Sequence, residues 1–138
     1  TIRAKMAAAS LLIKSGDLTA AETRMNELLP IQRARDDPLD IAETLTRLAE
    51  IDEANGSSDA ALAKHEEALL IRKRYLGADH LSVAGNINAM ALVHQSHNQL
   101  DRAMARFAEA LTVRRKRLGP HHLEVASILN NLVVRVTI

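Results

Sequence analysis

Two clusters of basic side chains are the first groups in the sequence that could do chemistry, because they could bind an anion. Arg72, Lys73 and Arg74 form one cluster, and residues 114–117 (Arg-Arg-Lys-Arg) form the other, 42 residues later. Such clusters can hold nucleic acid or an acidic partner. Each also stands just before a glycine, where cations oppose the negative end of a helix dipole. We favour this second interpretation: the clusters end two solvated helices and bind no nucleic acid.

Histidines are the next candidates, as metal ligands. His94 and His97 are three residues apart, a spacing that can chelate a metal on one helix face. That helix offers no carboxylate and no further histidine, so we expect no metal site. His80, His121 and His122 fall in expected loops, where we predict that they cap or pack against the start of a helix.

Acid–base and phosphate chemistry have weaker support. Asp52 and His65 are the residue types of a general acid–base pair. In an antiparallel helical hairpin, however, His65 would lie opposite Leu45 and Asp52 near the turn, so we expect that the two do not meet. The five glycines are isolated and form no phosphate-binding GxGxxG or GxxxxGK[ST] motif. We therefore expect no catalysis and no cofactor.

Composition narrows the class of protein further. The chain has 138 residues, of which 47% are hydrophobic and 1% aromatic, so its core must be aliphatic and rich in Ala. Its 18 basic and 17 acidic residues give a net charge of +1, which indicates no global field for nucleic acid. Cysteine is absent, which excludes disulfides and fits a cytoplasmic location. No apolar run approaches the roughly 20 residues that a membrane span needs.

The elements that position these residues recur with a period of 42. Residues 41–82 align with 83–124 without a gap, and 13 of the 42 positions are identical. The alignment continues into 125–138, and residues 1–40 fit the same template if their second helix is two residues shorter. Matching positions include Gly16, Gly56 and Asn98 at the end of each first helix.

Each repeat is typical of two short helices. Ile41, Leu45 and Leu48 have helical spacing before Gly56, and Leu62, Leu69 and other small or apolar residues precede Gly77. Two short helices cannot bury their own apolar faces, so neighbouring pairs must stack. We predict an all-α fold: a right-handed α-solenoid of antiparallel helix hairpins. It would form a single domain over 1–138, with about three and a half repeats and seven helices.

These positions resemble the tetratricopeptide repeat. The pattern of that family is matched in the second copy by Leu45, Leu48, Ala49, Gly56, Ala61, His65 and Ala68, and in the third by Ile87, Met90, Ala91, Asn98, Ala103, Phe107 and Ala110. The 42-residue period is similar to the longer repeats of kinesin light chains. Leu81 and Leu123 depart from the family, which usually has proline after the histidine.

The resemblance implies a non-catalytic scaffold or adaptor that binds a peptide or a helix in the concave groove lined by the first helices. The groove positions that we single out are Arg47, Glu50, Asn88, Leu92, Gln95, Asn130 and Asn131. Asparagine there would bind the backbone of the ligand. Arg47 could instead form an ordinary helix ion pair with Glu43 and Glu50. We expect a mixed or partly apolar ligand.

Residues 125–138 resemble a first helix without its second. Their apolar positions would lack cover on one side, which predicts self-association through Leu129, Leu132, Val133 and Val136. The other explanation is that the chain is a fragment of a longer protein, an idea that Thr1 in place of Met also suggests. The alternative function is thus a regulatory or oligomerisation segment of a larger multidomain protein.

Overall fold

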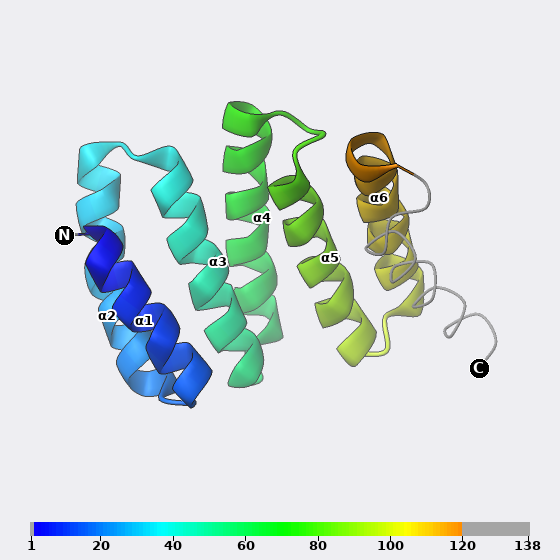
Figure 1. Ribbon diagram of the computed structural model, residues 1–138. Coiled ribbons are helices and arrows are strands. Elements are labelled where there is room, and N and C mark those ends of the chain that lie inside the picture. The colour runs from blue at the N-terminus through cyan, green and yellow to red at the C-terminus, as the bar shows by residue number, and fades with distance from the viewer. Residues whose placement is uncertain (1, 120–138) are drawn as a thin grey trace. The chain divides into compact units, whose positions relative to one another are not determined.

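The computed structural model describes residues 2–119, with side chains from Ala4 onward (Figure 1). These residues form six α-helices and no strand: α1 (Ile2–Ser15), α2 (Leu18–Arg35), α3 (Pro38–Ala54), α4 (Ser58–Leu76), α5 (Leu81–Ser96) and α6 (Leu100–Leu118). The predicted all-α class is confirmed, with six helices in this range instead of seven. The seventh helix, predicted over 125–138, lies outside the described residues. No helix between residues 2 and 119 is both long enough and apolar enough to cross a membrane.

The ends of the first helices follow the predicted equivalence. Gly56, just after α3, has φ 80°, and Asn98, at the same repeat position after α5, has φ 58°. Left-handed backbone ends a helix, and glycine and asparagine are the residues that adopt it most readily. Asn98 therefore takes the left-handed position that glycine takes in the preceding repeat.

Contacts group the chain into two compact units, Thr1–Ile71 and Arg72–Ile138, and the border falls inside α4. In unit 1, α2 packs against α1 and α3. Two clusters of buried side chains fill the contacts of unit 1: Ala9, Met25, Leu28 and Leu48 in the first, and Ile41, Ala42, Leu45 and Ala68 in the second. Alanine at these contacts lets the helix backbones approach closely.

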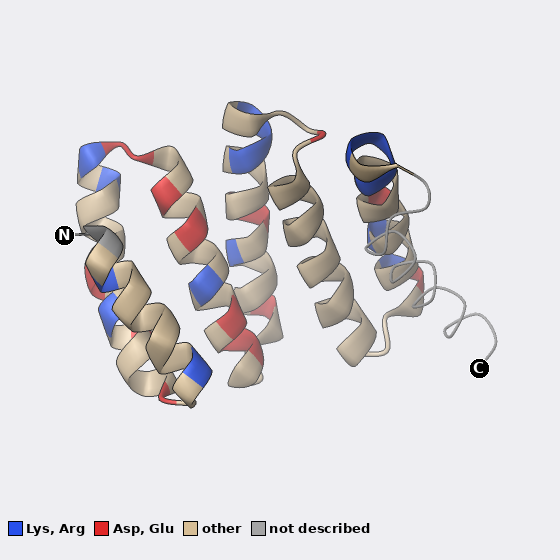
Figure 2. Cartoon of the chain, in the orientation of Figure 1, with Lys and Arg blue, Asp and Glu red and all other residues tan. Residues whose placement is uncertain are grey.

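In unit 2, α5 and α6 form an antiparallel hairpin with extensive mutual contact. Phe107 is fully buried there, together with Val83, Ile87 and several alanines. Helix α5 carries no Lys, Arg, Asp or Glu, so it appears without blue or red in Figure 2. Its exposed side is therefore neutral.

The starts of α3 and α5 show a proline in one repeat and a leucine in the next. Pro38 is the first residue of α3, where its missing N–H has no helical partner to lose. Leu81 takes the first position of α5, and His80 caps that helix, because its Nδ1 accepts a hydrogen bond from the Ser82 N–H at 3.1 Å. Proline is favoured at this position but not required. The prediction that a loop histidine caps a helix is confirmed for His80, whereas His121, His122 and Leu123 lie outside the described residues.

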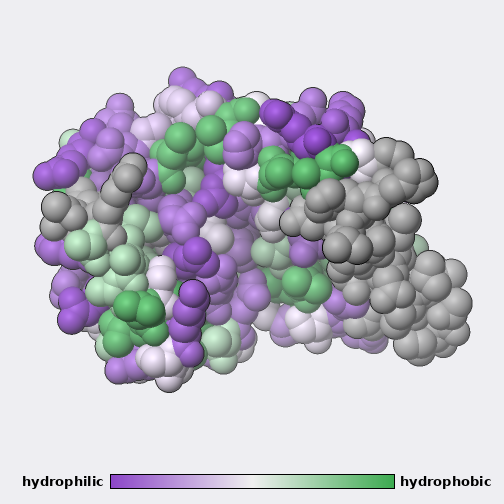
Figure 3. All heavy atoms as spheres, viewed as in Figure 1, coloured by the Kyte–Doolittle hydropathy of each residue, from purple (hydrophilic) through white to green (hydrophobic). Residues whose placement is uncertain are grey.

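Hydrophobic side chains also reach the surface. The most exposed are Leu11 (66%) and Leu70 (59%), with smaller exposed fractions for Ile31, Leu39, Tyr75, Leu81 and Leu92. On the face that Figure 3 shows, hydrophobic side chains form several separate patches among hydrophilic ones. Scattered apolar residues of this kind are normal on a protein surface.

Candidate protein-interaction surface

Only part of the first basic cluster consists of solvated cations at a helix end. Arg72 is 9% exposed, and its Nη1 donates a hydrogen bond to Asn86 Oδ1 of α5. The prediction of a solvated cation at this position was wrong, because Arg72 occupies a core position of the repeat. Lys73 and Arg74 follow it in the last turn of α4, and Arg74 lies over the Tyr75 ring at 5.6 Å from the centroid.

The second basic cluster holds a turn in place. Arg117 Nε donates to the Asp79 carbonyl oxygen at 2.7 Å, and Lys116 Nζ lies 3.5 Å from Asp79 Oδ1. Both contacts join the end of α6 to the turn between α4 and α5. The helix-end interpretation is thus confirmed for these two residues, which also have a structural partner.

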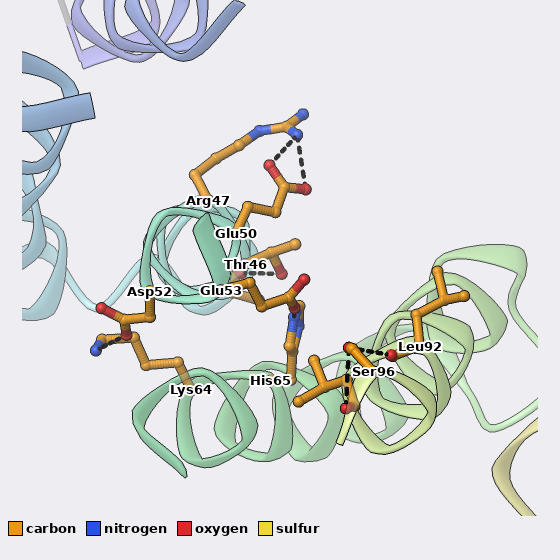
Figure 4. Close-up of polar contacts among 11 residues, drawn as sticks. Thr46, Arg47, Glu50, Asp52, Glu53, Lys64, His65, Leu92 and Ser96 are labelled. Carbon is orange, nitrogen blue, oxygen red and sulfur yellow. Dashed lines mark hydrogen bonds and ion pairs between the residues drawn. The ribbon is translucent and has the colours of Figure 1, made fainter. Parts of the chain in front are cut away.

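The acid–base candidates have separate partners (Figure 4). Asp52 forms an ion pair with Lys64, and His65 Nε2 lies 2.9 Å from Glu53 Oε1. Each of the two therefore has another partner, in line with the expectation that they form no acid–base pair. Leu45 packs with Ala68, one turn after His65 on α4.

The two histidines near the end of α5, His94 and His97, both have structural contacts. His94 is 9% exposed, and its Nδ1 lies 2.7 Å from Gln99 Oε1. His97 follows α5 as its C-terminal cap, and its backbone N–H bonds back to the last turn. Between residues 2 and 119, no group of three or more His, Asp or Glu side chains could hold a metal ion.

On α3, the predicted groove residues Arg47 and Glu50 form an ion-paired row. Arg47 lies 3.0 Å from Glu43 and 3.2 Å from Glu50, and all three side chains are little more than one third exposed. Partial burial lowers the pKa of the Arg47 guanidinium, but the charges and hydrogen bonds of Glu43 and Glu50 raise that pKa by more. Its net pKa lies above the usual value, and the ordinary helix ion pair is what the structure shows.

On α5, the predicted residues lie on the neutral side of the helix. Leu92 is 43% exposed, and Asn88 and Gln95 are partly exposed. The Asn88 Oδ1 atom is buried and accepts no hydrogen bond from the described part of the chain. Gly85 lies one turn before Asn88, and a Cβ built on it meets nothing within 4 Å. The helix thus combines a donor-seeking carbonyl oxygen with open space and an apolar side chain.

The remaining predicted positions belong to residues 129–136. Asn130 and Asn131 of the groove, and the apolar residues Leu129, Leu132, Val133 and Val136, lie outside the described residues.

Two buried polar pairs were missed by the sequence analysis. In unit 1, Thr44 Oγ1 donates to Gln32 Oε1 at 2.7 Å, and both residues are fully buried. In unit 2, Arg72 and Asn86 stand at the equivalent repeat positions. The sequence held a signal for these pairs. In α2 the buried spacing of Ala21, Met25 and Leu28 continues one turn later at Gln32, a polar residue at a core position.

A family profile described as Tetratricopeptide repeat matches residues 40–116, from the first turn of α3 to the last turns of α6. The chain belongs to the tetratricopeptide repeat family. The family predicted from the repeat period is therefore confirmed. No curated protein matches the sequence of this tetratricopeptide repeat chain.

Solved structures resemble this tetratricopeptide repeat chain over nearly all of its length. BtubC (BKLC) from P. vanneervenii is 30% identical, with a TM-score of 0.77, and the match covers 91% of this chain and 50% of that one. A putative kinesin light chain from Podosopora anserina, with nearly identical TPR-like repeats, is 20% identical, with a TM-score of 0.80 over 95% of this chain and 63% of that one. The predicted kinesin-light-chain-like repeat is confirmed, and the chain spans only 50% and 63% of the lengths of these proteins.

Proposed function

We propose that this chain is a non-catalytic protein-interaction scaffold or adaptor, and that its first helices bind a peptide or a helix in the concave groove implied by the family. Tetratricopeptide repeats generally mediate protein–protein interactions and are typically non-catalytic. Its lack of cysteine is compatible with a cytoplasmic location, which we also propose.

The single observation that carries the proposal is the Asn88 side chain. Its buried Oδ1 has no donor among the described residues. An unsatisfied buried acceptor costs about 1–3 kcal/mol. Because the Asn88 side chain is partly exposed, turning its amide outward would bring this oxygen to a ligand N–H, which recovers that free energy. A backbone amide of a bound peptide is such a donor, and it would be bound whatever the side chain next to it.

The chemistry around Asn88 supports a neutral or partly apolar ligand. Helix α5 has no formal charge, and Leu92 and Leu81 expose 43% and 37% of their surface. Arg47 and Glu50 of α3 are already paired, so we assign them a secondary role in contacting polar groups of the ligand. Asn130 and Asn131 extend the proposed set by repeat equivalence.

The test begins with peptides selected by phage display on the whole chain. The dissociation constant of a selected fluorescent peptide is then measured by polarisation for wild type, Asn88→Ala and Leu92→Asp. We expect each substitution to weaken binding about tenfold or more, because loss of one buried hydrogen bond or apolar contact is worth roughly 1–3 kcal/mol.

Asn26→Ala is the matched control, since Asn26 is an exposed asparagine on α2 in unit 1. It should bind like wild type. Equal affinities for wild type, Asn88→Ala and Leu92→Asp would refute the α5 site. A selection that returns only peptides with acidic C-termini would refute the proposed ligand chemistry.

A second candidate function is a regulatory or oligomerisation segment of a larger protein. It is motivated by the sequence of residues 125–138, whose apolar positions would lack cover on one side if they formed a first helix without its second. In this function the apolar residues Leu129, Leu132, Val133 and Val136 would form a self-association surface. Sedimentation of Leu132→Asp tests it: association that persists unchanged in this variant would refute that surface.

A further inference from the structure

The net charge of +1 conceals a strong separation of charge between the two units. Unit 1, residues 1–71, has 8 Lys and Arg against 13 Asp and Glu, which gives −5. Unit 2, residues 72–138, has 10 Lys and Arg against 4 Asp and Glu, which gives +6. Charge asymmetry between parts of one chain indicates an electrostatic interaction surface.

The positive charge of unit 2 gathers where α4 and α6 end. We call this surface the basic junction; its described residues are Lys73, Arg74, Arg115, Lys116 and Arg117 (Figure 2). Asp79, in the turn that joins α4 to α5, binds Lys116 and Arg117. Lys73, Arg74 and Arg115 form no ion pair with any residue that the structure describes, so the junction keeps an excess of cations.

Unit 1 has an acidic surface at the equivalent place, where α2 ends and α3 begins. This acidic junction consists of Asp36, Asp37 and Asp40, none of which forms an ion pair with the described residues. Arg33 and Arg35 are the cations in the last turn of α2, and Arg33 is bound to Glu67 at 2.9 Å, so the acidic junction keeps an excess of carboxylates. Asp36 is exposed, and Asp37 and Asp40 are partly exposed.

We propose that the basic junction of one copy binds the acidic junction of a second copy of this chain. The argument is charge complementarity: the carboxylates that the basic junction lacks are unpaired at the corresponding turn of the same chain. Nucleic acid is a poorer occupant, because the whole chain has a net charge of only +1 and just two aromatic residues on which bases could stack. This association is independent of the peptide site on α5 and of the apolar residues near the C-terminus.

Association of this kind must depend strongly on salt. The Debye length falls from about 30 Å at 0.01 M salt to about 3 Å at 1 M. In sedimentation equilibrium of the whole chain, we expect the apparent mass at about 0.01 M salt to rise with concentration above that of one copy, because each added copy leaves one junction of either kind free. The association constant should fall at least about tenfold on going to 1 M. A monomer at every concentration in low salt, or association that salt does not weaken, would overturn the proposal.

Variants with reversed charges provide the decisive test of the proposal. Arg74→Glu/Arg115→Glu removes the net positive charge of the basic junction, because the two new carboxylates and Asp79 balance the three cations that remain, and it leaves the acidic junction intact. Asp37→Lys/Asp40→Lys makes the acidic junction basic and leaves the basic junction intact. Each variant alone should be monomeric, whereas an equimolar mixture should associate, since the acidic junction of the first meets the basic junction of the second. Circular dichroism melts verify that both variants fold. If the mixture stays monomeric while each variant is folded, the pairing is refuted.

A matched control distinguishes an effect of the basic junction from an effect of net charge. Arg115→Glu and Arg102→Glu make the same change of charge on α6, but Arg102 is exposed near the start of the helix. We expect only Arg115→Glu to weaken association. Equal weakening by both, or binding of a labelled DNA oligonucleotide by a chain that stays monomeric, would count against the proposed partner.

Discussion

At the scale of the residue, Arg72 shows how a charged side chain can occupy a core position. It continues the buried spacing of Ala61, His65 and Ala68, so an aliphatic residue would be expected there. Burying a guanidinium without a partner is costly, and the hydrogen bond to Asn86 offsets part of that cost. Gln32 and Thr44 form the corresponding pair in unit 1, with neutral groups. Both pairs link a second helix to the next first helix.

The first prediction concerns this link. Asn86→Ala removes the acceptor of a buried Arg72 N–H, so the free energy of unfolding should fall by about 1–3 kcal/mol. Urea denaturation followed by circular dichroism measures the change. Asn26→Ala, at an exposed position, should stay within about 0.5 kcal/mol of wild type. The structural role of the pair is wrong if the two variants are equally stable.

At the scale of the element, the sequence predicts helix ends better than the side-chain contacts between helices. Gly56 and Asn98 could be matched in advance because left-handed backbone admits few residue types. The contact of His65 with Glu53 could not, because spacing along one helix defines its buried face but not which side chains of the partner helix it reaches. The pair of Asp52 and Lys64 was missed for the same reason. Arg72 was misassigned because charge suggested solvent, although its position in the repeat indicated the core.

Pro30 provides the second prediction, since it lies in the interior of α2. Proline there cannot donate to the Asn26 carbonyl and strains the preceding turn, at a cost of about 3 kcal/mol. Pro30→Ala restores the backbone donor. It also raises the conformational entropy of the unfolded chain, which lowers the free energy of unfolding by up to about 1 kcal/mol. We therefore expect the free energy of unfolding to rise by about 1–2 kcal/mol, measured in urea.

Pro38→Ala is the control for Pro30→Ala. Pro38 is the first residue of α3, where proline loses no helical hydrogen bond. This variant should be equal to wild type or slightly less stable. A gain in stability for Pro38→Ala as large as that for Pro30→Ala would show that position in the helix does not matter.

At the scale of the whole molecule, the charge separation could have been found from the sequence, but the net charge of the whole chain conceals it. Counting charges repeat by repeat would have revealed it, because the acidic residues cluster before residue 72. The border of the two units inside α4 could not be read in the same way. The border depends on the contacts that each helix makes. The 42-residue period predicts only that α4 and α6 are alike, so it marks no border inside α4.

The two units also predict how the molecule opens. Repeat proteins are stabilised mainly by contacts between neighbours, so a local defect should loosen its own unit first. Met25 and Phe107 are fully buried at equivalent repeat positions in units 1 and 2. Replacing either by Ala should cost about 2–5 kcal/mol.

Hydrogen exchange measured by mass spectrometry then distinguishes local from global opening. Phe107→Ala should speed amide exchange in α5 and α6 more than in α1 and α2, and Met25→Ala should do the reverse. Phe107→Leu, a milder change, keeps the comparison possible if Phe107→Ala unfolds the chain. Uniform acceleration in all six described helices, in both units and for every variant, would mean that the chain opens as one cooperative body. The border inside α4 would then have no energetic meaning.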